Sequence, residues 1–346
     1  MTHAADGRTA HLNLRERYLP YKNLIGEVMV DKNPAIRTAI NKTETLGAEN
    51  EFRVLEYEIL AGDPDLQVEL TEESCRFHFD YSKVFWNSKL SSEHKRIADK
   101  FEPGDAICDV MAGIGPFVVP AGKKGVFAWA NDLNPDCFKG LQESIKLNKV
   151  SSRSNLLLRV FKLIKKVAQY VEPFNEDGHS FISNSAARLL RSNYVARIPK
   201  KTSRTQAKQK ITKPADRVIE IAQPRTFSHY IMNLPSTAMD FLPNFIGLYA
   251  GHEDLFEPQT TTRLPMIHCY CFGPRHDADG QDLDPDVAVQ QACESVSTKL
   301  QYNIDIGSPD LEIHAVRDVA PNKRQLCASF RLPAAVAFRR RDLFTG

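Results

Sequence analysis

Three aspartates and an asparagine in this chain each stand where a buried strand is expected to end. Asp109 ends the run AICD, Asp132 follows VFAWAN, Asp177 follows VEPFNE, and Asn233 follows FSHYIM. Carboxylate oxygens accept hydrogen bonds from hydroxyl and amino groups, and an amide both donates and accepts them. Residues at successive strand ends meet at one edge of a parallel sheet. The sequence therefore predicts one site for a ligand that carries hydroxyl or amino groups.

The first aspartate opens the stretch Asp109 to Phe117, DVMAGIGPF, which contains a Gly113-x-Gly115 turn. Glycine has no Cβ and tolerates positive φ, so such a turn lets the backbone approach a ligand closely. The acid suits a ligand with hydroxyl or amino groups more than a pyrophosphate. The alternative is a strand–turn–helix unit whose glycines serve packing alone.

The elements that must position these residues alternate between strand and helix from Asp105 onward. The expected strands are AICDVMAG, VFAWANDLNP, VEPFNEDG, FSHYIMNLP and MIHCYCFG. The expected helices are PFVVPAGKKG, DCFKGLQESIKLNK, HSFISNSAARLLRS, STAMDFLPNFIGLY and DPDVAVQQACESVSTKL. LEIHAVRDVAP and QLCASFRLP are expected to form a closing hairpin. This order predicts an α/β fold with a doubly wound, mostly parallel sheet.

A small α+β domain is expected before this sheet. We assign residues 1–16 to an unstructured lead-in, 17–92 to the small domain, and 93–346 to the larger α/β domain. NLIGEVMV, FRVLEYEIL and SCRFHFDYS are its strand candidates. Between the first two, DKNPAIRTAINKTETLGAENE carries turn residues and one candidate short helix.

A helix capped by Ser91 or Ser92 is expected just before the glycine turn, carrying Glu93 and His94 in its first turns. His94 and the preceding Lys89 can therefore lie against the same pocket. Their alternative interpretation is a solvated helix start. Similarly, the Asn-x-Pro turn at Asn233 and Pro235 is either a simple chain turn or a ligand-facing one.

Two segments interrupt the alternating pattern. Residues 151–164 are longer than a crossover needs, so we interpret them as an insertion or as a defect in the predicted gene. Residues 188–226 form a basic excursion. From residue 188 to residue 213 there are nine Lys or Arg and no Asp or Glu. Such a run is typical of a solvated loop, with a nucleic-acid patch as the alternative.

The composition is that of a globular protein with a large core. The chain has 346 residues, 42% of them hydrophobic and 25% charged, with a net charge of +2. Its seven cysteines form no CxxC pair, and the odd count argues against a disulfide framework. No metal site is expected. No apolar segment reaches membrane-spanning length, and no targeting signal is readable at the start.

Six ordered motifs carry a family resemblance from His11 to about Pro333. They are HLNLRERYLPYKNLIGEVMVDKNP, VFWNSKLSSEHKR, CDVMAGIGPFVVPAGKKG, ANDLNP, FNEDG and MNLP. In this order they resemble the eukaryotic and archaeal type of tRNA (guanine(37)-N(1))-methyltransferase. The resemblance implies a class I methyltransferase fold that uses S-adenosyl-L-methionine. It also implies methylation of the guanosine 3′ of the anticodon, which maintains the reading frame and begins wybutosine formation in some tRNAs.

The resemblance also assigns roles to residues. The loop with Asp109, Gly113 and Gly115 corresponds to the cradle for the methionine part of the cofactor. The remaining cofactor positions are Asp132 and Leu133 at the ribose, Asp177 and Gly178 at the adenine, and His94 and Asn233 elsewhere in the pocket. Lys89, Asn233 and Pro235 match catalytic positions, with Asn233 and the Leu234–Pro235 turn orienting the guanine edge.

Guanine N1 carries a proton at neutral pH, so the reaction needs a base, for which Glu93 and Asp132 are the candidates. The chain departs from the family at Lys89 and His179, where arginine is usual, and we expect it to lack the family's separate N-terminal domain. Lysine keeps the charge of arginine but loses its planar fork.

The expected partner is the anticodon stem-loop of tRNA, with no membrane and a monomeric chain. The resemblance implies cytoplasm and nucleus, with the mitochondrial matrix as a further compartment. Two alternatives stay open from the residues. One is a tRNA-binding protein of the same fold with weak or no activity. The other is a methylase of another amine substrate, because Asn-x-Pro turns also occur in amine methylases.

Overall fold

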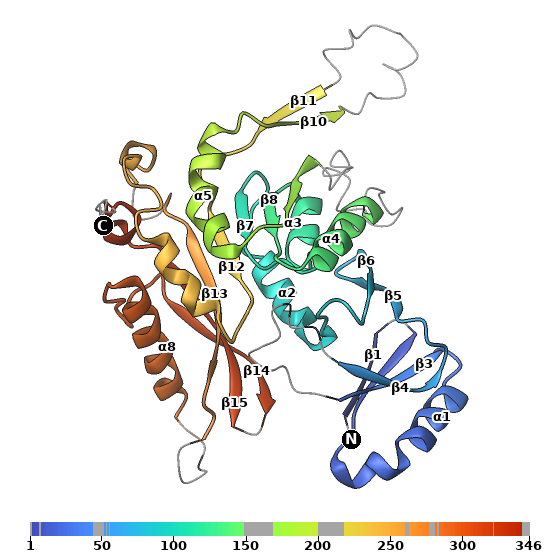
Figure 1. The fold of residues 1–346 in the computed structure, drawn as a ribbon. Helices are drawn as coiled ribbons and strands as arrows, with labels where there is room; N and C mark the ends of the chain where they lie inside the picture. Colours follow the sequence, from blue (N-terminus) through green and yellow to red (C-terminus); the bar gives the residue numbers. More distant parts are fainter. Residues whose placement is uncertain are drawn as a thin grey trace, which may run out of the picture.

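The computed structural model describes residues 2–6, 8–43, 56–148, 169–199, 218–259, 263–276, 284–320 and 322–340, and the single positions 52, 54 and 281. Within these residues a seven-stranded sheet forms the centre of the molecule, in the order β14-β15-β13-β12-β7-β8-β9 (Figure 1). A four-stranded sheet, β1-β2-β3-β4, lies beside it.

The central sheet has the predicted doubly wound topology. Its parallel strands are β7 (Ala106–Asp109), β8 (Phe127–Asn131), β9 (Val171–Phe174), β12 (His229–Met232) and β13 (Met266–Gly273). The antiparallel hairpin β14 (Glu312–Ala320) and β15 (Lys323–Arg331) closes one side. All residues of β7 and β8 are buried, as expected for strands covered on both faces. The strand order reverses between β7 and β12, so a ligand site is expected at their carboxyl ends.

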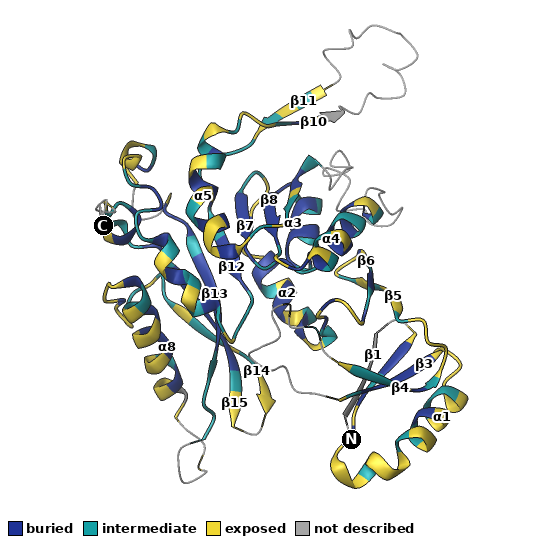
Figure 2. Ribbon diagram, viewed as in Figure 1, coloured by how far each residue is buried: buried dark blue, intermediate teal, exposed yellow. Residues whose placement is uncertain are grey.

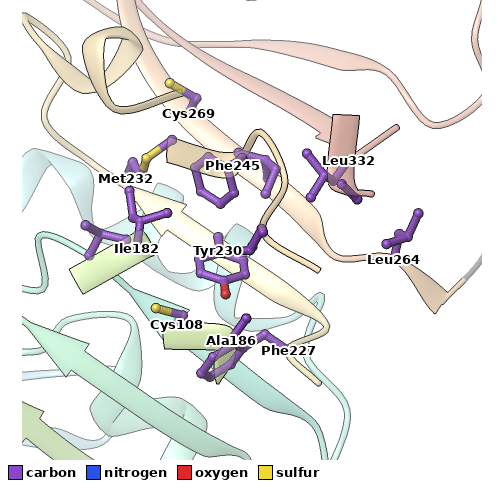
Figure 3. Packing of buried hydrophobic residues seen from close by; sticks show 14 of the residues in the cluster. Cys108, Ile182, Ala186, Phe227, Tyr230, Met232, Phe245, Leu264, Cys269 and Leu332 are labelled. Atoms are coloured by element: carbon purple, nitrogen blue, oxygen red, sulfur yellow. The ribbon is translucent and has the colours of Figure 1, made fainter. Parts of the chain in front are cut away.

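Helices cover both faces of this sheet. On one face lie α2 (Ser91–Ala98), α3 (Val118–Lys124) and α4 (Pro135–Leu147), whose apolar residues share one core cluster. On the other face lie α5 (Gly178–Arg191), the 3₁₀ helix η6 (Ala238–Phe245), α8 (Pro285–Leu300) and the short α9 (Ala334–Ala337). In Figure 3, Tyr230 and Met232 of β12 pack against Ile182 of α5 and Phe245 of η6. Figure 2 shows the buried strands between helices whose outer faces are exposed.

The prediction of an unstructured lead-in over residues 1–16 is wrong. This segment contains β1 (Thr2–Asp6) and β2 (Thr9–Asn13), which pair with each other, and β2 also pairs with β3 (Thr38–Lys42). The strand TAHLN carries few large apolar residues, so its own sequence signals a strand only weakly. Pairing with β3, which itself was expected to be turn or helix, supplies the missing stability.

The strand predicted for NLIGEVMV is also wrong, because this stretch belongs to helix α1 (Lys22–Lys32), which follows the 3₁₀ helix η1 (Glu16–Tyr21). Ile25 and Met29 pack from α1 against Leu12 and Leu60 of the small sheet. Their spacing of four residues fits one face of a helix. The last strand of this sheet, β4 (Tyr57–Gly62), overlaps the second half of the predicted FRVLEYEIL segment and ends two residues beyond it.

The hairpin of β5 (Gln67–Glu72) and β6 (Cys75–Asp80) packs mainly with the larger domain. Its buried residues Val68, Phe77 and Phe79 belong to the same core cluster as α2, α3 and α4. The structural division therefore lies between β4 and β5, earlier than the predicted boundary at residue 92.

Smaller differences concern helix ends and connections. Neither Ser91 nor Ser92 caps α2, because a 3₁₀ turn, η2 (Ser88–Leu90), runs directly into it and Asn87 caps that turn. The helix expected in STAMDFLPNFIGLY is a 3₁₀ helix that contains Pro243, and η7 (Glu253–Leu255) follows it. The proposed insertion 151–164 lies outside the described residues. Within the basic excursion, β10 (Val195–Pro199) pairs with β11 (Val218–Ala222), and residues 200–217 lie outside the described residues.

Candidate cofactor site

Asp109 ends β7 with a completely buried side chain. Neither of its carboxylate oxygens has a hydrogen-bond partner among the described residues. Burial, followed by the charge of Asp132, raises the pKa of Asp109 well above its ordinary value, although the nearby Met111 amide acts in the opposite direction. Buried polar groups are nearly always hydrogen-bonded in a functional state. The two oxygens therefore indicate a position where a ligand donates hydrogen bonds.

The two glycines of the turn have different reasons to be glycine. Gly113 has φ +55°, and a Cβ placed there meets nothing within 4 Å. Gly115 has φ +97°, and its Cβ meets Leu141 Cδ1 at 2.7 Å and Val119 Cγ2 at 2.9 Å. Gly115 thus lets the turn pack on α3 and α4, whereas the open space at Gly113 leaves room for a ligand. The packing explanation is confirmed for Gly115, and the ligand explanation stays a prediction for Gly113.

Asp132 ties the end of β8 to this turn. Its Oδ2 accepts a hydrogen bond from the Gly113 amide at 2.8 Å, and its Oδ1 accepts one from the Asn134 amide at 2.9 Å. Burial raises the pKa of Asp132 to about 6, while the two amides act in the opposite direction. At neutral pH this half-buried group is a carboxylate with lone pairs left for hydroxyl donors. The neighbouring Leu133 exposes 43% of its surface at the same edge.

Asn131 is a site residue that the sequence did not reveal. It is fully buried, and its Nδ2 donates to the carbonyls of Val110 at 3.1 Å and Glu176 at 2.9 Å. Its Oδ1 accepts from the Glu176 amide at 2.9 Å. One side chain therefore holds together the loops that follow β7, β8 and β9. The only sequence signal was its place beside Asp132 in the ANDLNP motif.

The loop after β9 presents Asp177 and Gly178. Asp177 caps α5, with its Oδ1 accepting from the Ser180 amide at 2.9 Å, and it remains exposed. A Cβ on Gly178 meets Phe241 Cε1 at 2.8 Å, so glycine permits close packing on η6. Arg188 supports the loop from behind by donating to both carboxylate oxygens of Glu176 at 2.8 and 3.0 Å. The exposed side chain of Asp177 is thus held at the carboxyl end of the sheet, where Asp109 and Asp132 also lie.

The end of β12 completes this edge. Ile231 pairs with Asp109 across the two strands, so Asn233 lies just beyond it. Gln325 Nε2 of β15 donates to Asn233 Oδ1 at 3.4 Å, and no described residue accepts from Asn233 Nδ2. The turn through Pro235 is closed by the amides of Thr237 and Ala238, which donate to the Leu234 carbonyl. The structure therefore places Asn233 and Pro235 with the aspartates, as the sequence predicted.

Lys89 lies in η2 with an exposed side chain, and no described contact joins it to the strand ends. The segment before it is nevertheless fixed to the site, because Asn134 Nδ2 donates to the Lys83 carbonyl at 2.9 Å.

His94 is buried, with its Nδ1 2.6 Å from Glu72 Oε1 and its ring edge-on to Phe117 at 5.0 Å. It therefore reaches the glycine loop through Phe117.

Glu93, a candidate base, is buried where α2 packs against Tyr270 of β13. It is 3% exposed, and Arg96 donates to both of its oxygens at 2.7 and 2.8 Å. The Tyr270 hydroxyl also donates to its Oε1 at 2.6 Å. Glu93 therefore anchors α2 to the sheet, and its role as base stays a prediction.

His179, the other departure from the family pattern, stacks on Phe241 with ring centroids 4.0 Å apart, beside Gly178.

The cofactor expected from the resemblance fits these residues. The loop offers open space at Gly113, Asp132 offers carboxylate lone pairs, and Asp109 has two unsatisfied buried oxygens. These are acceptors for an amino group and for ribose hydroxyls. In the described residues no group of three or more metal-ligating side chains gathers.

Known protein families match most of the chain in two parts. The TRM5/TYW2 methyltransferase domain matches residues 68–196, and the TYW2 N-terminal domain matches residues 5–65. The tRNA (guanine(37)-N(1))-methyltransferase of Fusarium vanettenii is 46% identical over 344 residues, covering 97% of this chain and 68% of that protein. This chain belongs to the tRNA (guanine(37)-N(1))-methyltransferase family. The family member from Neurospora crassa is 48% identical over 343 residues, covering 97% of this chain and 66% of that protein.

Solved structures of the family share the fold. Trm5b from Pyrococcus abyssi superposes with a TM-score of 0.60 at 21% identity, covering 95% of this chain and 74% of that chain. The complex of aTrm5 with tRNALeu gives a TM-score of 0.59 at 20% identity, covering 96% and 72%. This chain spans about two thirds of the length of the two fungal family members.

Proposed function

We propose that this chain transfers the methyl group of S-adenosyl-L-methionine to N1 of the guanosine at position 37 of tRNA. One observation carries the proposal. In a chain of this family, Asp132 accepts from the Gly113 and Asn134 amides at the carboxyl end of the sheet, and the space beside Gly113 is open. Identities of 46% and 48% to two tRNA (guanine(37)-N(1))-methyltransferases support the same substrate.

The strand ends divide the binding of the cofactor among them. Asp132 accepts from the ribose hydroxyls, with Leu133 alongside, and Asp177 with Gly178 receives the adenine. Asp109 and the amides of the glycine loop receive the methionine part. When bound, the cofactor supplies a methyl group on a good sulfur leaving group, so the protein mainly has to position and desolvate the reactants.

The guanine is held by residues on both sides of the pocket. Asn233 offers a free amide donor at the end of β12, and the Leu234–Pro235 turn fixes its direction. Lys89 brings a positive charge to the guanine oxygen, where negative charge develops as N1 loses its proton. The anticodon loop must present this base splayed out of its stack.

The proton of N1 requires an acceptor, for which Glu93 and Asp132 are the two candidates. In the cofactor arrangement proposed above, Asp132 already accepts from the ribose hydroxyls, whereas Arg96 and Tyr270 donate to Glu93. Both acids remain candidates.

Transfer of labelled methyl from the cofactor to unmodified tRNA tests the proposal. We expect incorporation into tRNA with guanosine at position 37 and none when that guanosine is replaced. Incorporation that persists after the replacement indicates another methyl acceptor. RNA binding with no transfer indicates a binding protein of the same fold. Either result contradicts the proposal.

Lys89 variants test the catalytic assignment in the same assay. Lys89→Met should lower kcat about 10- to 100-fold, because a hydrogen bond to a charged group contributes about 1.5–3 kcal/mol. Lys89→Arg should raise kcat, since the guanidinium restores a bidentate donor. Lys83→Met removes a nearby exposed charge and should leave kcat unchanged. Equal rates for the Lys89 and Lys83 variants contradict the role of Lys89.

We further propose that the chain is a monomer and works in cytoplasm and nucleus, and also in the mitochondrial matrix. The support is the family resemblance. Among the described helices, none is long and apolar enough to cross a membrane. Light scattering after gel filtration tests the oligomeric state, and imaging of the tagged full chain tests the compartments. A dimer mass or a single different compartment contradicts the corresponding part.

A further inference from the structure

The small N-terminal sheet is apolar on both faces, and each face has a different partner. Leu12, Ala39 and Leu60 pack against α1. Ile40, the next residue of β3 after Ala39, instead joins the core cluster of the methyltransferase domain, with Tyr57 packed beside it. Alternate residues of a strand point to opposite faces, so one face of the sheet at β3 packs on α1 and the other faces the catalytic domain. We call the face that carries Ile40 and Tyr57 the junction face. In Figure 1 the sheet lies between α1 and the β5–β6 hairpin.

Lys42, at the end of β3, belongs to the junction face. It follows Ile40 by two residues and pairs with Tyr57 across β3 and β4. His11 of β2 pairs with Ile40 and therefore points to the same side. Its ring contacts Tyr57 at 5.1 Å and the buried Tyr81 of the catalytic domain at 5.8 Å. The side chain of Lys42 thus begins where the small sheet meets the catalytic domain.

Lys89 brings a second positive charge to this junction. Burial lowers the pKa of His11 to about 4, and the charges of Lys42 and Lys89 both add to that effect. Both ammonium groups therefore lie close enough to His11 to act on it. His11 Nε2 is itself buried and has no hydrogen-bond partner among the described residues. The junction gathers two cations and one unsatisfied imidazole nitrogen.

No described carboxylate balances these charges. Neither Lys42 nor Lys89 has an ion pair within the described residues, and burial lowers the pKa of Lys42. The nearest acid on β4, Glu58, pairs in register with Asn41 and so points to the other face. There its oxygens accept from Lys22 and from Asn41. Clustered, unpaired cations of this kind favour an anionic ligand.

We propose that Lys42, on the same face of the sheet as His11, binds a backbone phosphate of the RNA next to the target guanosine that Lys89 holds. The proposal rests on the proposed function, because it takes Lys89 to lie at the guanine. RNA carries a phosphate at each nucleotide, so a cation next to the guanine-binding lysine meets a neighbouring phosphate first. The phosphate also offsets the two positive charges around His11 and gives its imidazole an acceptor. The N-terminal sheet is thereby part of the RNA site and not only a support for it.

Binding of an anticodon stem-loop RNA by the full chain tests this site. Lys42→Gln should raise the Kd about 5- to 10-fold and reduce the slope of log Kd against log salt by about 0.7–0.9, the loss expected for one phosphate contact. Lys42→Arg should restore most of the affinity. Lys32→Gln, at an exposed position of α1 on the opposite side of the sheet, should bind like wild type. S-adenosyl-L-methionine should bind all variants with unchanged Kd.

A wild-type Kd and salt slope for Lys42→Gln overturn the proposal. A second measurement uses the wild-type chain, so it does not depend on whether a variant folds. The His11 ring signals in NMR should titrate at higher pH with the RNA bound than without it, and an unchanged titration also overturns the proposal. Failure of the proposed function is a different result, in which the wild-type chain does not methylate the RNA at all.

Discussion

Asp109 and Asp132 end neighbouring strands, yet their surroundings give them different chemistry. Asp132 accepts from two backbone amides, and its pKa is raised only to about 6. Neither oxygen of Asp109 has a hydrogen bond of normal geometry within the described residues, and burial, followed by the charge of Asp132, raises its pKa well above its ordinary value. The two carboxyl groups therefore differ in what they offer a ligand, because Asp132 is already held by two amides. The sequence places both acids correctly, but it cannot distinguish them, because the difference comes from amides contributed by other loops.

Asp132 makes cofactor binding depend on pH. Its pKa in the folded chain, about 6, lies above the ordinary 3.8, so the group takes up a proton as the pH falls through 6. The neutral acid is a weaker acceptor for ribose hydroxyls, so the Kd for S-adenosyl-L-methionine should rise below pH 6. Asp132→Asn should weaken binding about 10- to 100-fold at pH 8, since hydrogen bonds to charged groups contribute about 1.5–3 kcal/mol.

Calorimetric titration between pH 5 and pH 8 measures this effect. Asp136→Asn is the matched control, because Asp136 lies in the first turn of α4 but does not bind the glycine loop. The control should keep the wild-type profile, and Asp132→Asn should lose the pH dependence near 6. A control profile that changes as much as that of Asp132→Asn contradicts the assignment.

At the scale of elements, the site depends on loops that follow different strands. One buried side-chain amide joins these loops. Asn131 connects Val110 after β7 with Glu176 after β9, and Asp132 connects β8 with the glycine turn. The strands themselves could be predicted, because AICD, FAWAN and HYIM are short apolar runs bounded by turn residues. The hydrogen bonds of Asn131 could not, since they join residues 21 and 45 positions apart.

Asn131→Ala should destabilise the chain by roughly 3 kcal/mol, at about 1 kcal/mol for each of three lost hydrogen bonds. It should also weaken cofactor binding, because the three loops lose their common support. Asn148→Ala is the matched control. Asn148 is buried and makes three similar bonds to Arg76 and Ser144, away from the strand ends. Denaturant unfolding should show similar losses for both variants, with cofactor affinity lost only for Asn131→Ala. Equal loss of affinity contradicts the role of Asn131.

The two glycines should separate binding from packing. Gly113→Ala meets no atom within 4 Å, and its φ of +55° costs an alanine about 1–2 kcal/mol. Its main effect should be a higher Kd for the cofactor. Gly115→Ala adds a clash with Leu141 at 2.7 Å to its φ of +97°, so it should lower the melting temperature much more. Thermal unfolding and cofactor titration of both variants check this. The opposite order of melting temperatures contradicts the packing account.

At the scale of the whole molecule, the alternation of strands and helices was sufficient to predict the central sheet and the edge that carries the site. The N-terminal sheet was predicted poorly because its stability is tertiary. β1 and β2 contain few large apolar residues, and the apolar face of α1 is apparent only against Leu12 and Leu60. The junction between this sheet and the catalytic domain was likewise hidden, since His11, Lys42 and Lys89 lie far apart in the sequence.

The most direct measurement of the central claim is mass spectrometry of tRNA nucleosides and mapped fragments after incubation with the chain and S-adenosyl-L-methionine. The account predicts 1-methylguanosine, located at position 37, with about 10- to 100-fold slower formation by Lys89→Met. A methyl group at another position or on another atom of guanine contradicts the account. So does the absence of any methyl transfer by a wild-type chain that binds the cofactor.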